Sequence, residues 1–435
     1  MTYDLPPLSG TELPHLRTEL PGPASRAAVD LLAQHECPAI TARRARRAQA
    51  MGASTDDPFI WAEARGANVR DADGNTFVDL TAGFAVALLG HAHPKVVAAA
   101  QAQTARLVHA MGDAWPDLTR ARLLATLSKV APGDLDVAIL GLSGADAVDA
   151  AIKTAVLATG RNGVITFTGG YHGLALGVLG LQGYKPAFTD PFRGITHPHV
   201  RTLPFACDAG TLAGALQDGT VGMVMVEPVQ GRGGMRTAPT GWLSQVAQIT
   251  RKHGALLAFD EIQCGLGRTG TMWAGPGEGV LPDLLCVGKA LGGGFPVSAT
   301  LGSRAVMDAW GASTGEAIHT QTFLGHPVGS AAALAALDVI QQHDIPSRCA
   351  RIGGGLTERL RERGYAVRGR GLMLGVQLGA ASFPVCRALQ RRGFITLPAG
   401  QQAEVVALTP PAVITADQQE AFLSALDASV AEVSA

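Results

Sequence analysis

Charged and aromatic residues are scarce in this chain of 435 residues, at 16% and 5% of the total. The 35 basic residues nearly balance the 36 acidic ones, so the formal net charge is −1. A chain with this balance has no electrostatic attraction for nucleic acid or for an anionic membrane. The basic cluster at residues 43–47 is a local exception, which we interpret as a solvated or subunit-facing surface. Neither nucleic acid nor a membrane is expected as a partner.

Cysteine is also rare. The six thiols are scattered, without a Cys-x-x-Cys pair or a regular spacing, at Cys37, Cys207, Cys264, Cys286, Cys349 and Cys386. This pattern argues against a disulfide framework or a zinc site, and it is typical of reduced thiols in a cytoplasm. The first residues lack the basic stretch and apolar core of a signal peptide, and no run approaches the ~20 apolar residues of a membrane span. We therefore expect a cytoplasmic protein.

Hydrophobic residues, by contrast, make up 47% of the chain, which indicates a well-buried globular protein. A chain of 435 residues is too long for one compact core, so at least two domains are expected. We expect an N-terminal arm and part of a small domain at residues 1–80, a large domain at 81–328, and the rest of the small domain at 329–435.

Several short apolar runs in the middle of the chain do not alternate with polar residues. Strands that are covered on both faces show this pattern, so the runs predict a mostly parallel sheet with helices on each side, an α/β fold. Helical patterns occur at Pro94–Val108, at Leu118–Val130 and from about Ser330, and a hairpin is predicted within residues 67–80. The apolar runs are Val137–Leu140, Gly163–Phe167, Val221–Val226, Ala255–Phe259 and Leu284–Val287.

Two of these runs end in residues with unusual chemistry. The run at Leu284–Val287 is followed by Gly288 and Lys289, a lysine among small and apolar residues, and the run before it ends in Asp260 and Glu261. A lysine in an apolar pocket loses hydration, which lowers the pKa of its amine and makes it a usable nucleophile. A carboxylate at the end of a buried strand can pair with the ring nitrogen of a cofactor. Together, Lys289 and Asp260 indicate a Schiff-base lysine with a pyridinium counter-ion, which is the chemistry of pyridoxal 5'-phosphate (PLP).

Three further strand ends carry candidate ligand-binding residues. Ser143-Gly144-Ala145 follows the first run and opens a helix, which makes it either a phosphate site or a plain helix cap. Tyr171 and His172 follow the second run, where the aromatic ring either stacks on a planar cofactor or packs in the core. Glu227 ends the third run. Because ligands of open α/β sheets lie at the carboxyl ends of the strands, these residues are expected around one site.

Two other patterns suggest a different function at first sight. The spaced glycines in Gly265–Gly270 do not open a helix after a strand, so we do not interpret them as a dinucleotide-binding motif. His91 and His93 lie two residues apart without further ligands, so we expect a structural role for them and no metal site.

On these motifs, nearly the whole chain from about Pro21 onward resembles the class III (ω-amino acid) aminotransferases of the fold-type I PLP enzymes. The resemblance implies a large domain with a mostly parallel, mixed sheet flanked by helices, and a smaller α+β domain built from both termini. It also implies a homodimer with shared active sites. The motifs occur in the family's order at Gly83–Val86 with Gly90–Pro94, Ser143–Ala147, Tyr171–Gly173, Glu227–Gly231, Phe259–Gln263 with Gly267–Gly270, and Gly288–Gly294.

The resemblance also assigns roles to individual residues. Lys289 would hold PLP as the internal aldimine and, once released by substrate, would shuttle the proton between Cα, or the terminal carbon, and C4′. Asp260 would pair with the pyridinium nitrogen. Thr322 matches the threonine that reaches the phosphate from the neighbouring subunit. The other expected cofactor contacts are Gln263 with the ring hydroxyl, the backbone of Gly144 and Ala145 with the phosphate, Tyr171 and Ile262 with the two ring faces, and Ser143, His172 and Glu227 around them.

The chain departs from the family at two positions that concern the substrate carboxylate. Many members carry an arginine shortly before the C-terminal Pro-Pro, where Ala407 stands here, and another after the His-Gly pair, where Leu174 stands. Without these guanidinium groups, bidentate binding of an α-carboxylate is not expected. Glu227 commonly pairs with the first of these arginines in the family, so here it would be protonated or would need a cation. We hypothesise that Glu227 or another pocket group receives an amino group, which favours diamines, basic amino acids or apolar amines as donors.

The resemblance leaves two reactions open. The first is an aminotransferase that moves an amino group from an amine or amino acid to a 2-oxo acid by a ping-pong mechanism. The second is an amino acid racemase or epimerase, since some close relatives keep the same PLP site and share an entry segment like Leu20-Pro21-Gly22-Pro23. A PLP-fold protein retained only as a binding module would have lost Lys289 or Asp260, and both are present.

Overall fold

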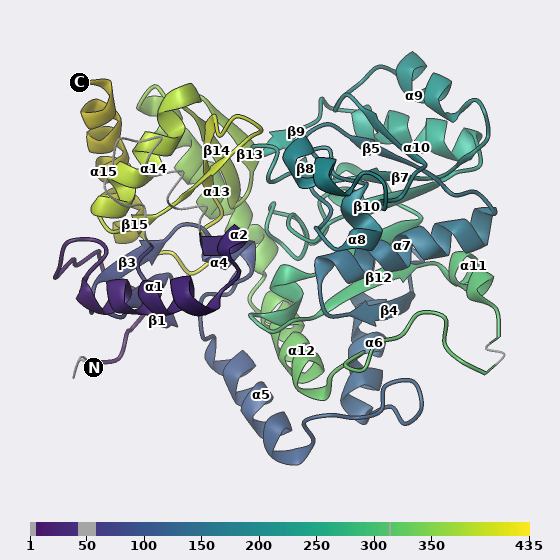
Figure 1. The fold of residues 1–435 in the computed structure, drawn as a ribbon, viewed down its shortest axis with the longest axis horizontal. Helices are drawn as coiled ribbons and strands as arrows, with labels where there is room; N and C mark the ends of the chain where they lie inside the picture. Colours follow the sequence, from purple (N-terminus) through teal and green to yellow (C-terminus); the bar gives the residue numbers. More distant parts are fainter. Residues whose placement is uncertain (1–5, 42–57, 313–314) are drawn as a thin grey trace.

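The protein forms two lobes that lie side by side (Figure 1). One lobe contains both ends of the chain, and the other contains its middle part. The structure, a computed structural model, describes residues 6–41, 58–312 and 315–435, so the basic cluster at residues 43–47 lies outside the described residues. None of the described helices combines the length and the apolar character that crossing a bilayer requires.

A seven-stranded sheet forms the centre of the larger lobe, in the strand order β4-β12-β11-β10-β7-β5-β6. Strand β12 (Ser298–Gly302) is antiparallel to both of its neighbours, and the other neighbouring strands are parallel. The sheet is therefore mixed but mostly parallel, as predicted. Its other strands are β4 (Val137–Gly141), β5 (Gly163–Phe167), β6 (Val200–Leu203), β7 (Val221–Val226), β10 (Leu256–Asp260) and β11 (Leu284–Val287).

Helices cover both faces of this sheet, because successive residues of the central strands point to opposite sides. Leu285 and Val287 of β11 join the hydrophobic core on one face, whereas Leu284 and Cys286 join the core on the other. The apolar runs without alternation arise in this way, so the interpretation of buried strands is confirmed. One face carries α5 (Pro94–Arg106), α6 (Leu118–Val130), α9 (Ala209–Leu216), α10 (Trp242–Lys252) and α12 (Pro327–Gln342), and the other carries α7 (Gly144–Thr159), α8 (Leu176–Leu179) and α11 (Arg304–Met307).

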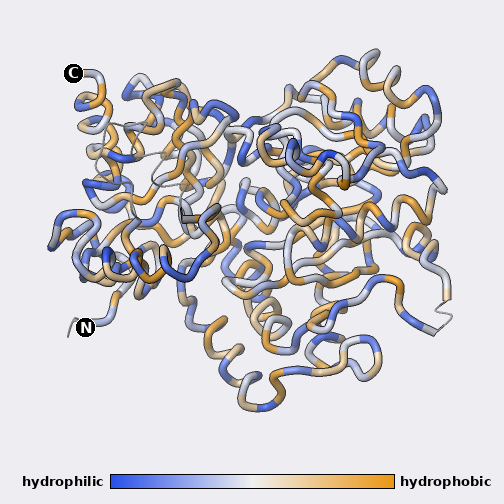
Figure 2. The backbone as a smooth tube through the Cα atoms, viewed as in Figure 1, coloured by the Kyte–Doolittle hydropathy of each residue, from blue (hydrophilic) through white to orange (hydrophobic). Residues whose placement is uncertain are grey.

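The smaller lobe joins segments from the two ends of the chain. Strand β15 (Phe394–Ile395) pairs in parallel with β3 (Thr76–Asp79), within a sheet of order β1-β2-β3-β15, and a second sheet has the order β13-β14-β17-β16. The lobe is α+β and comes from both termini, as the resemblance implies, while the boundaries after residues 80 and 328 stay predictions. Hydrophobic residues run through the interior of both lobes (Figure 2).

The elements of the smaller lobe have the following bounds: β1 (Trp61–Arg65), β2 (Asn68–Asp71), β13 (Val367–Arg370), β14 (Met373–Gln377), β16 (Leu397–Ala399), β17 (Val405–Leu408), α1 (Pro23–His35), α2 (Pro38–Thr41), α13 (Ile345–Glu362), α14 (Ser382–Arg391) and α15 (Ala416–Ser434). The helix predicted from about Ser330 begins earlier, because Pro327 occupies its first turn, where a missing N–H group costs nothing. Helix α5 ends at Arg106, two residues before the predicted end.

Candidate active site

The carboxyl ends of five strands meet along one edge of the central sheet. A cavity of about 280 Å³ lies at this edge, and it is lined by every residue that the sequence predicts for the site except Thr322. The lining residues are Ser143, Gly144, Ala145, Tyr171, His172, Gly173, Glu227, Asp260, Ile262, Gln263 and Lys289. Parallel strands bring residues from five distant parts of the sequence together in this way. Thr322, in contrast, is exposed in the turn before α12.

Asp260 and His172 form a buried pair at the bottom of the site. Nδ1 of His172 lies 2.8 Å from Oδ2 of Asp260, and the other oxygen of Asp260 accepts a hydrogen bond from the N–H of Ile262 at 3.1 Å. Burial lowers the pKa of His172, but the hydrogen bond and the charges of Asp260 and Glu227 outweigh burial, so its pKa is raised. His172 therefore fixes the orientation of the Asp260 carboxyl group. The sequence predicted His172 near the cofactor but not this pairing.

Glu227 has hydrogen-bond partners, although the missing arginine had led us to expect an unpaired carboxylate. Its two carboxylate oxygens accept hydrogen bonds from the N–H groups of Tyr171, at 2.5 Å, and Gly231, at 3.1 Å. Burial raises the pKa of Glu227 to about 7, despite these two bonds and the neighbouring His172. Glu227 thus ties the Tyr171 and Gly231 loops together through backbone partners. Its raised pKa favours the protonated form near neutral pH, so the expectation of a protonated or cation-bound carboxyl stays a prediction.

Lys289 lies directly after β11 in an unusual backbone conformation. Its φ angle is +45°, in the left-handed region that residues with a Cβ atom rarely adopt, and such strain gathers at functional sites. Burial lowers the pKa of Lys289 from its ordinary value of 10.5, and the charges of Asp260 and Glu227 oppose this only in part. The amine is therefore closer to its neutral, nucleophilic form than a surface lysine would be.

The start of α7 forms another wall of the cavity. Ser143 caps the helix, since its side chain accepts a hydrogen bond from the N–H of Asp146, while the Asp146 carboxylate accepts one from the N–H of Ser143. A Cβ atom on Gly144 would lie only 2.9 Å from Cδ1 of Ile262, so the Ile262 side chain would have to shift if this residue were larger. The first N–H groups of an α-helix have no partner within the helix, and here Gly144 and Ala145 place them at the cavity. Both sequence interpretations of this segment, helix cap and anion site, are compatible with the structure.

A second, smaller cavity of about 60 Å³ adjoins the first, and Gln263 lines both. Ala407, where the family often has arginine, lines the smaller cavity, and so does Arg232. Arg232 was not singled out in the sequence, although it directly follows the motif Glu227–Gly231. The sequence did offer a signal for Arg232, because it is a positively charged residue directly after a motif that follows a buried strand. Leu174, the other departure from the family, lines neither cavity and is 45% exposed.

The residues of the larger cavity fit PLP in their chemistry. Asp260 offers a carboxylate to a pyridinium nitrogen, Lys289 offers an amine with a lowered pKa, and the start of α7 offers N–H groups to a phosphate. Tyr171 and Ile262 add an aromatic and an aliphatic surface for a planar ring. Among the described residues, no group of three or more His, Cys, Asp and Glu side chains could hold a metal ion.

Comparison with known proteins points to the same chemistry. A family model described as aminotransferase class-III matches residues 51–430. The acetylornithine aminotransferase of Methanopyrus kandleri is 38% identical over 85% of this chain and 93% of its own. The LysW-aminoadipate semialdehyde transaminase of Deinococcus radiodurans is 35% identical over 85% of each chain.

Solved structures agree in fold. The ornithine aminotransferase of Toxoplasma gondii has a TM-score of 0.83 and 28% identity, over 95% of this chain and 97% of its own. An (S)-enantioselective omega-transaminase from Thermomicrobium roseum has a TM-score of 0.79 and 27% identity, over 87% of this chain and 93% of its own. These relatives carry aminotransferase names, and nothing in the comparisons supports the racemase alternative. The chain belongs to the class III aminotransferases, and it is a PLP-dependent aminotransferase of fold type I.

Proposed function

We propose that this aminotransferase moves the amino group of an amino acid or amine to a 2-oxo acid in two half-reactions, with Lys289 as the catalytic proton carrier and Asp260 as the partner of the cofactor's ring nitrogen. One observation carries this assignment. Lys289 and Asp260 follow the adjacent parallel strands β11 and β10, so their side chains reach one cavity from neighbouring strand ends.

The other residues of the cavity support these two. When bound, PLP supplies an electron sink for bond breaking at the carbon that carries the amino group. With the cofactor bound, Lys289 would carry the proton between that carbon and C4′, for which its lowered pKa is suited. His172 orients the Asp260 carboxyl group through their 2.8 Å contact. The α7 start binds the phosphate, Gln263 binds the ring hydroxyl, and Tyr171 and Ile262 hold the ring between them.

For the donor, we propose a molecule with a terminal primary amine. The named relatives act on acetylornithine and on LysW-aminoadipate semialdehyde, both of which carry the reacting group at the end of a side chain. In this chain, the smaller cavity offers an apolar wall for such a side chain, formed by Phe84, Met235, Leu397, Pro398 and Ala399. Phe84 reaches this wall from the turn Ala82–Ala85, in which all four residues have positive φ angles.

We also propose that the enzyme is a cytoplasmic homodimer. Large apolar side chains are exposed between α5 and α6 (Val108, Met111, Trp115 and Leu118), and the ring of Phe323 lies 5.3 Å from that of His109 in the same region. Burying this surface against a second copy would bring the exposed Thr322, next to Phe323, to the subunit interface. The six described cysteines are free thiols, four of them buried, which fits a reducing compartment.

A single-turnover experiment tests the reaction. The purified protein, loaded with PLP, is mixed with a donor amine in the absence of any 2-oxo acid. The proposal predicts stoichiometric conversion of the bound cofactor to pyridoxamine phosphate, and its return to PLP when 2-oxoglutarate or pyruvate is added. A racemase would interconvert the enantiomers of an amino acid without this conversion, which would overturn the assignment.

A further inference from the structure

Arg232 stands out around the site because, among the described residues, no acidic side chain pairs with its guanidinium. Among the residues that the structure describes, its guanidinium makes no hydrogen bond or ion pair, and its Nε atom is buried without a hydrogen-bond partner. Burying part of a guanidinium without a counter-ion costs free energy, and a bound anion would offset this cost. The group is therefore suited to receive an anion.

The surroundings hold Arg232 in place for such a role. Its guanidinium carbon lies over the ring of Tyr171, 4.9 Å from the centroid, and over that of Tyr184, at 5.3 Å. The Tyr184 hydroxyl is anchored to the carbonyl of Gly400 at 3.0 Å, and the N–H of Gly400 donates to the carbonyl of Arg232 at 2.9 Å. Cation–π contacts of this kind hold the guanidinium over the two rings.

The position of Arg232 connects it to the reaction. Arg232 lines the smaller cavity together with Gln263, which also lines the cavity of Lys289. Its charge reaches the catalytic lysine, since Arg232 adds to the lowering of the Lys289 pKa that burial mainly causes. Ala407, which has the smallest side chain that a chiral residue offers, also lines this cavity and leaves room in it.

We propose that Arg232 binds the carboxylate of the amino acid and 2-oxo acid substrates and so determines which substrates this enzyme accepts. This inference rests on the proposed function. It replaces the expectation that the chain lacks a guanidinium for a carboxylate: the arginine is present, but it comes from the loop after β8 (Val229–Gln230) instead of from β17. A planar fork of N–H donors over two aromatic rings suits one carboxylate, bound with two hydrogen bonds.

Binding of a plain carboxylate tests the proposal without requiring turnover. Isothermal titration of the PLP-loaded enzyme with pentanoate and with the uncharged pentanamide compares two ligands of similar shape. We expect the wild type to prefer pentanoate, Arg232→Gln to lose that preference by about 10- to 100-fold, and Arg232→Lys to retain part of it. Arg236→Gln is the matched control, because Arg236 also lies over an aromatic ring, that of Phe205 at 5.0 Å, and lines neither cavity.

Kinetics with a matched donor pair adds a second measurement. Ornithine and 1,4-diaminobutane share a terminal amine and differ by one carboxylate. Arg232→Gln should lower kcat/KM for ornithine about 10- to 100-fold more than that for 1,4-diaminobutane. An equal fall for both donors, or a carboxylate preference that survives in Arg232→Gln, would show that Arg232 is only structural. If neither donor converts the cofactor, the proposed donor class fails, while the titration still decides the role of Arg232.

Discussion

Three carboxylates are buried at the carboxyl ends of β7 and β10, and each has different hydrogen-bond partners. Asp260 faces His172, whereas Glu227 and Glu261 are each held by two backbone N–H groups. The two glutamates differ in what they connect: Glu227 joins loops of the cavity, and Glu261 binds the N–H groups of Ala274 and Gly275 away from it. The chemistry of each acid therefore depends on its neighbours and not on its residue type.

Removing the lysine tests the catalytic assignment. We expect Lys289→Ala to lower the rate of amino transfer at least 10²- to 10⁴-fold, since both the covalent attachment of PLP and the proton carrier are lost. The measurement is steady-state formation of the amino acid product. Lys129→Ala, which removes an exposed lysine of α6, should keep full activity. Substantial turnover by the Lys289→Ala enzyme would contradict the assignment.

Glu261 predicts a pH-dependent stability. Burial raises its pKa from the ordinary 4.5 to about 7, even though the bonds from Ala274 and Gly275 oppose this. The folded protein then holds this proton more tightly than the unfolded chain, so the associated stability is present below pH 4.5 and is lost as the pH rises toward 7. The free energy of unfolding falls by about 3 kcal/mol over this pH range.

Comparing wild type with Glu261→Gln isolates this contribution, because all other groups titrate in both proteins. We expect the Tm advantage of the wild type over Glu261→Gln to shrink by a few degrees between pH 5 and pH 8. A Tm difference that stays constant over this range would show that Glu261 does not titrate there.

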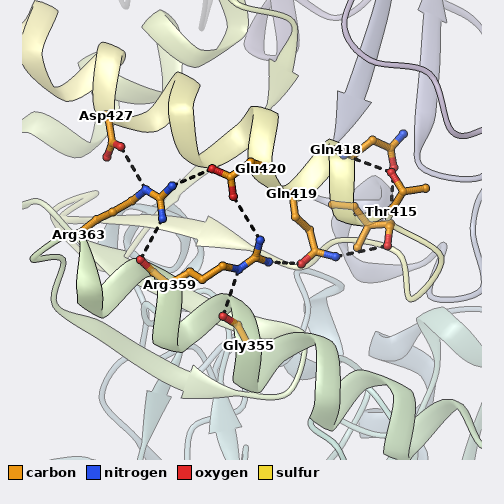
Figure 3. Close-up of polar contacts among 9 residues, drawn as sticks. Gly355, Arg359, Arg363, Thr415, Gln418, Gln419, Glu420 and Asp427 are labelled. Carbon is orange, nitrogen blue, oxygen red and sulfur yellow. Dashed lines mark hydrogen bonds and ion pairs between the residues drawn. The ribbon is translucent and has the colours of Figure 1, made fainter.

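At the scale of secondary-structure elements, the stability of each lobe depends on the contacts between its helices and strands. Helices α13 and α15 of the smaller lobe are linked by a polar network (Figure 3). Arg363 contacts Glu420 at 2.9 Å and Asp427 at 3.2 Å, and Arg359 contacts Glu420 at 3.5 Å. Beneath it, Phe422 of α15 is 1% exposed and packs on Phe394 with ring centroids 5.9 Å apart.

These two kinds of contact differ in their contribution to stability. Ion pairs with exposed partners are worth about 0–1 kcal/mol, whereas truncating a buried phenylalanine costs about 3–5 kcal/mol. Glu420 is 55% exposed, so Arg363→Ala should change the Tm little and Phe422→Ala should lower it strongly. Thermal unfolding at low and high salt measures both, and a larger effect from Arg363→Ala would reverse this ranking.

A substitution in the first turn of α7 is expected to weaken cofactor binding and to leave the stability of the fold nearly unchanged. In Gly144→Ala the new Cβ atom meets Cδ1 and Cγ2 of Ile262 at 2.9 and 3.1 Å, so Ile262 must move in the cavity. Ile262 can relieve this contact by turning into the cavity, where it would obstruct the cofactor ring. Because the overpacking cost of about 1–3 kcal/mol then opposes cofactor binding, we expect PLP affinity to fall about tenfold or more with little change in the Tm of the apoenzyme. Gly354→Ala is the control, because no atom lies within 4 Å of its new Cβ in α13. Unchanged PLP affinity in Gly144→Ala would remove this helix end from the phosphate site.

For the whole molecule, the exposed apolar surface between α5 and α6 determines the expected assembly. Trp115 is 70% exposed and Leu118 is 63% exposed, which is costly for a protein that stays monomeric. If this surface forms the subunit interface, Trp115→Glu should shift the protein toward monomers and lower its activity, since Thr322 of a second copy would leave the site.

Sedimentation equilibrium measures this shift. Leu31→Glu serves as the control, because Leu31 is 59% exposed on α1, away from this surface. A wild type that sediments as a monomer, or a Trp115→Glu protein that remains fully associated and active, would contradict the proposed interface.

The sequence by itself determined the strands of the central sheet and most of the cavity. The run at Val221–Val226 and the run at Leu284–Val287 became strands with the predicted bounds, because strands buried on both faces must be apolar throughout. Lys289 and Asp260 could be predicted because each lies where such a run ends, Asp260 as the last residue of β10 and Lys289 two residues after β11. The end of an apolar run in the sequence marks the edge of the sheet.

Only the tertiary structure decided how the charges of the site are balanced. The pairing of His172 with Asp260, the two N–H groups that hold Glu227, and the unpartnered guanidinium of Arg232 beside Ala407 join segments far apart in the chain. A residue's local sequence reports whether it is buried, through the pattern of its neighbours. The electrostatic partner of a buried charge depends on which loops the folded sheet brings together, and that information exists only in three dimensions.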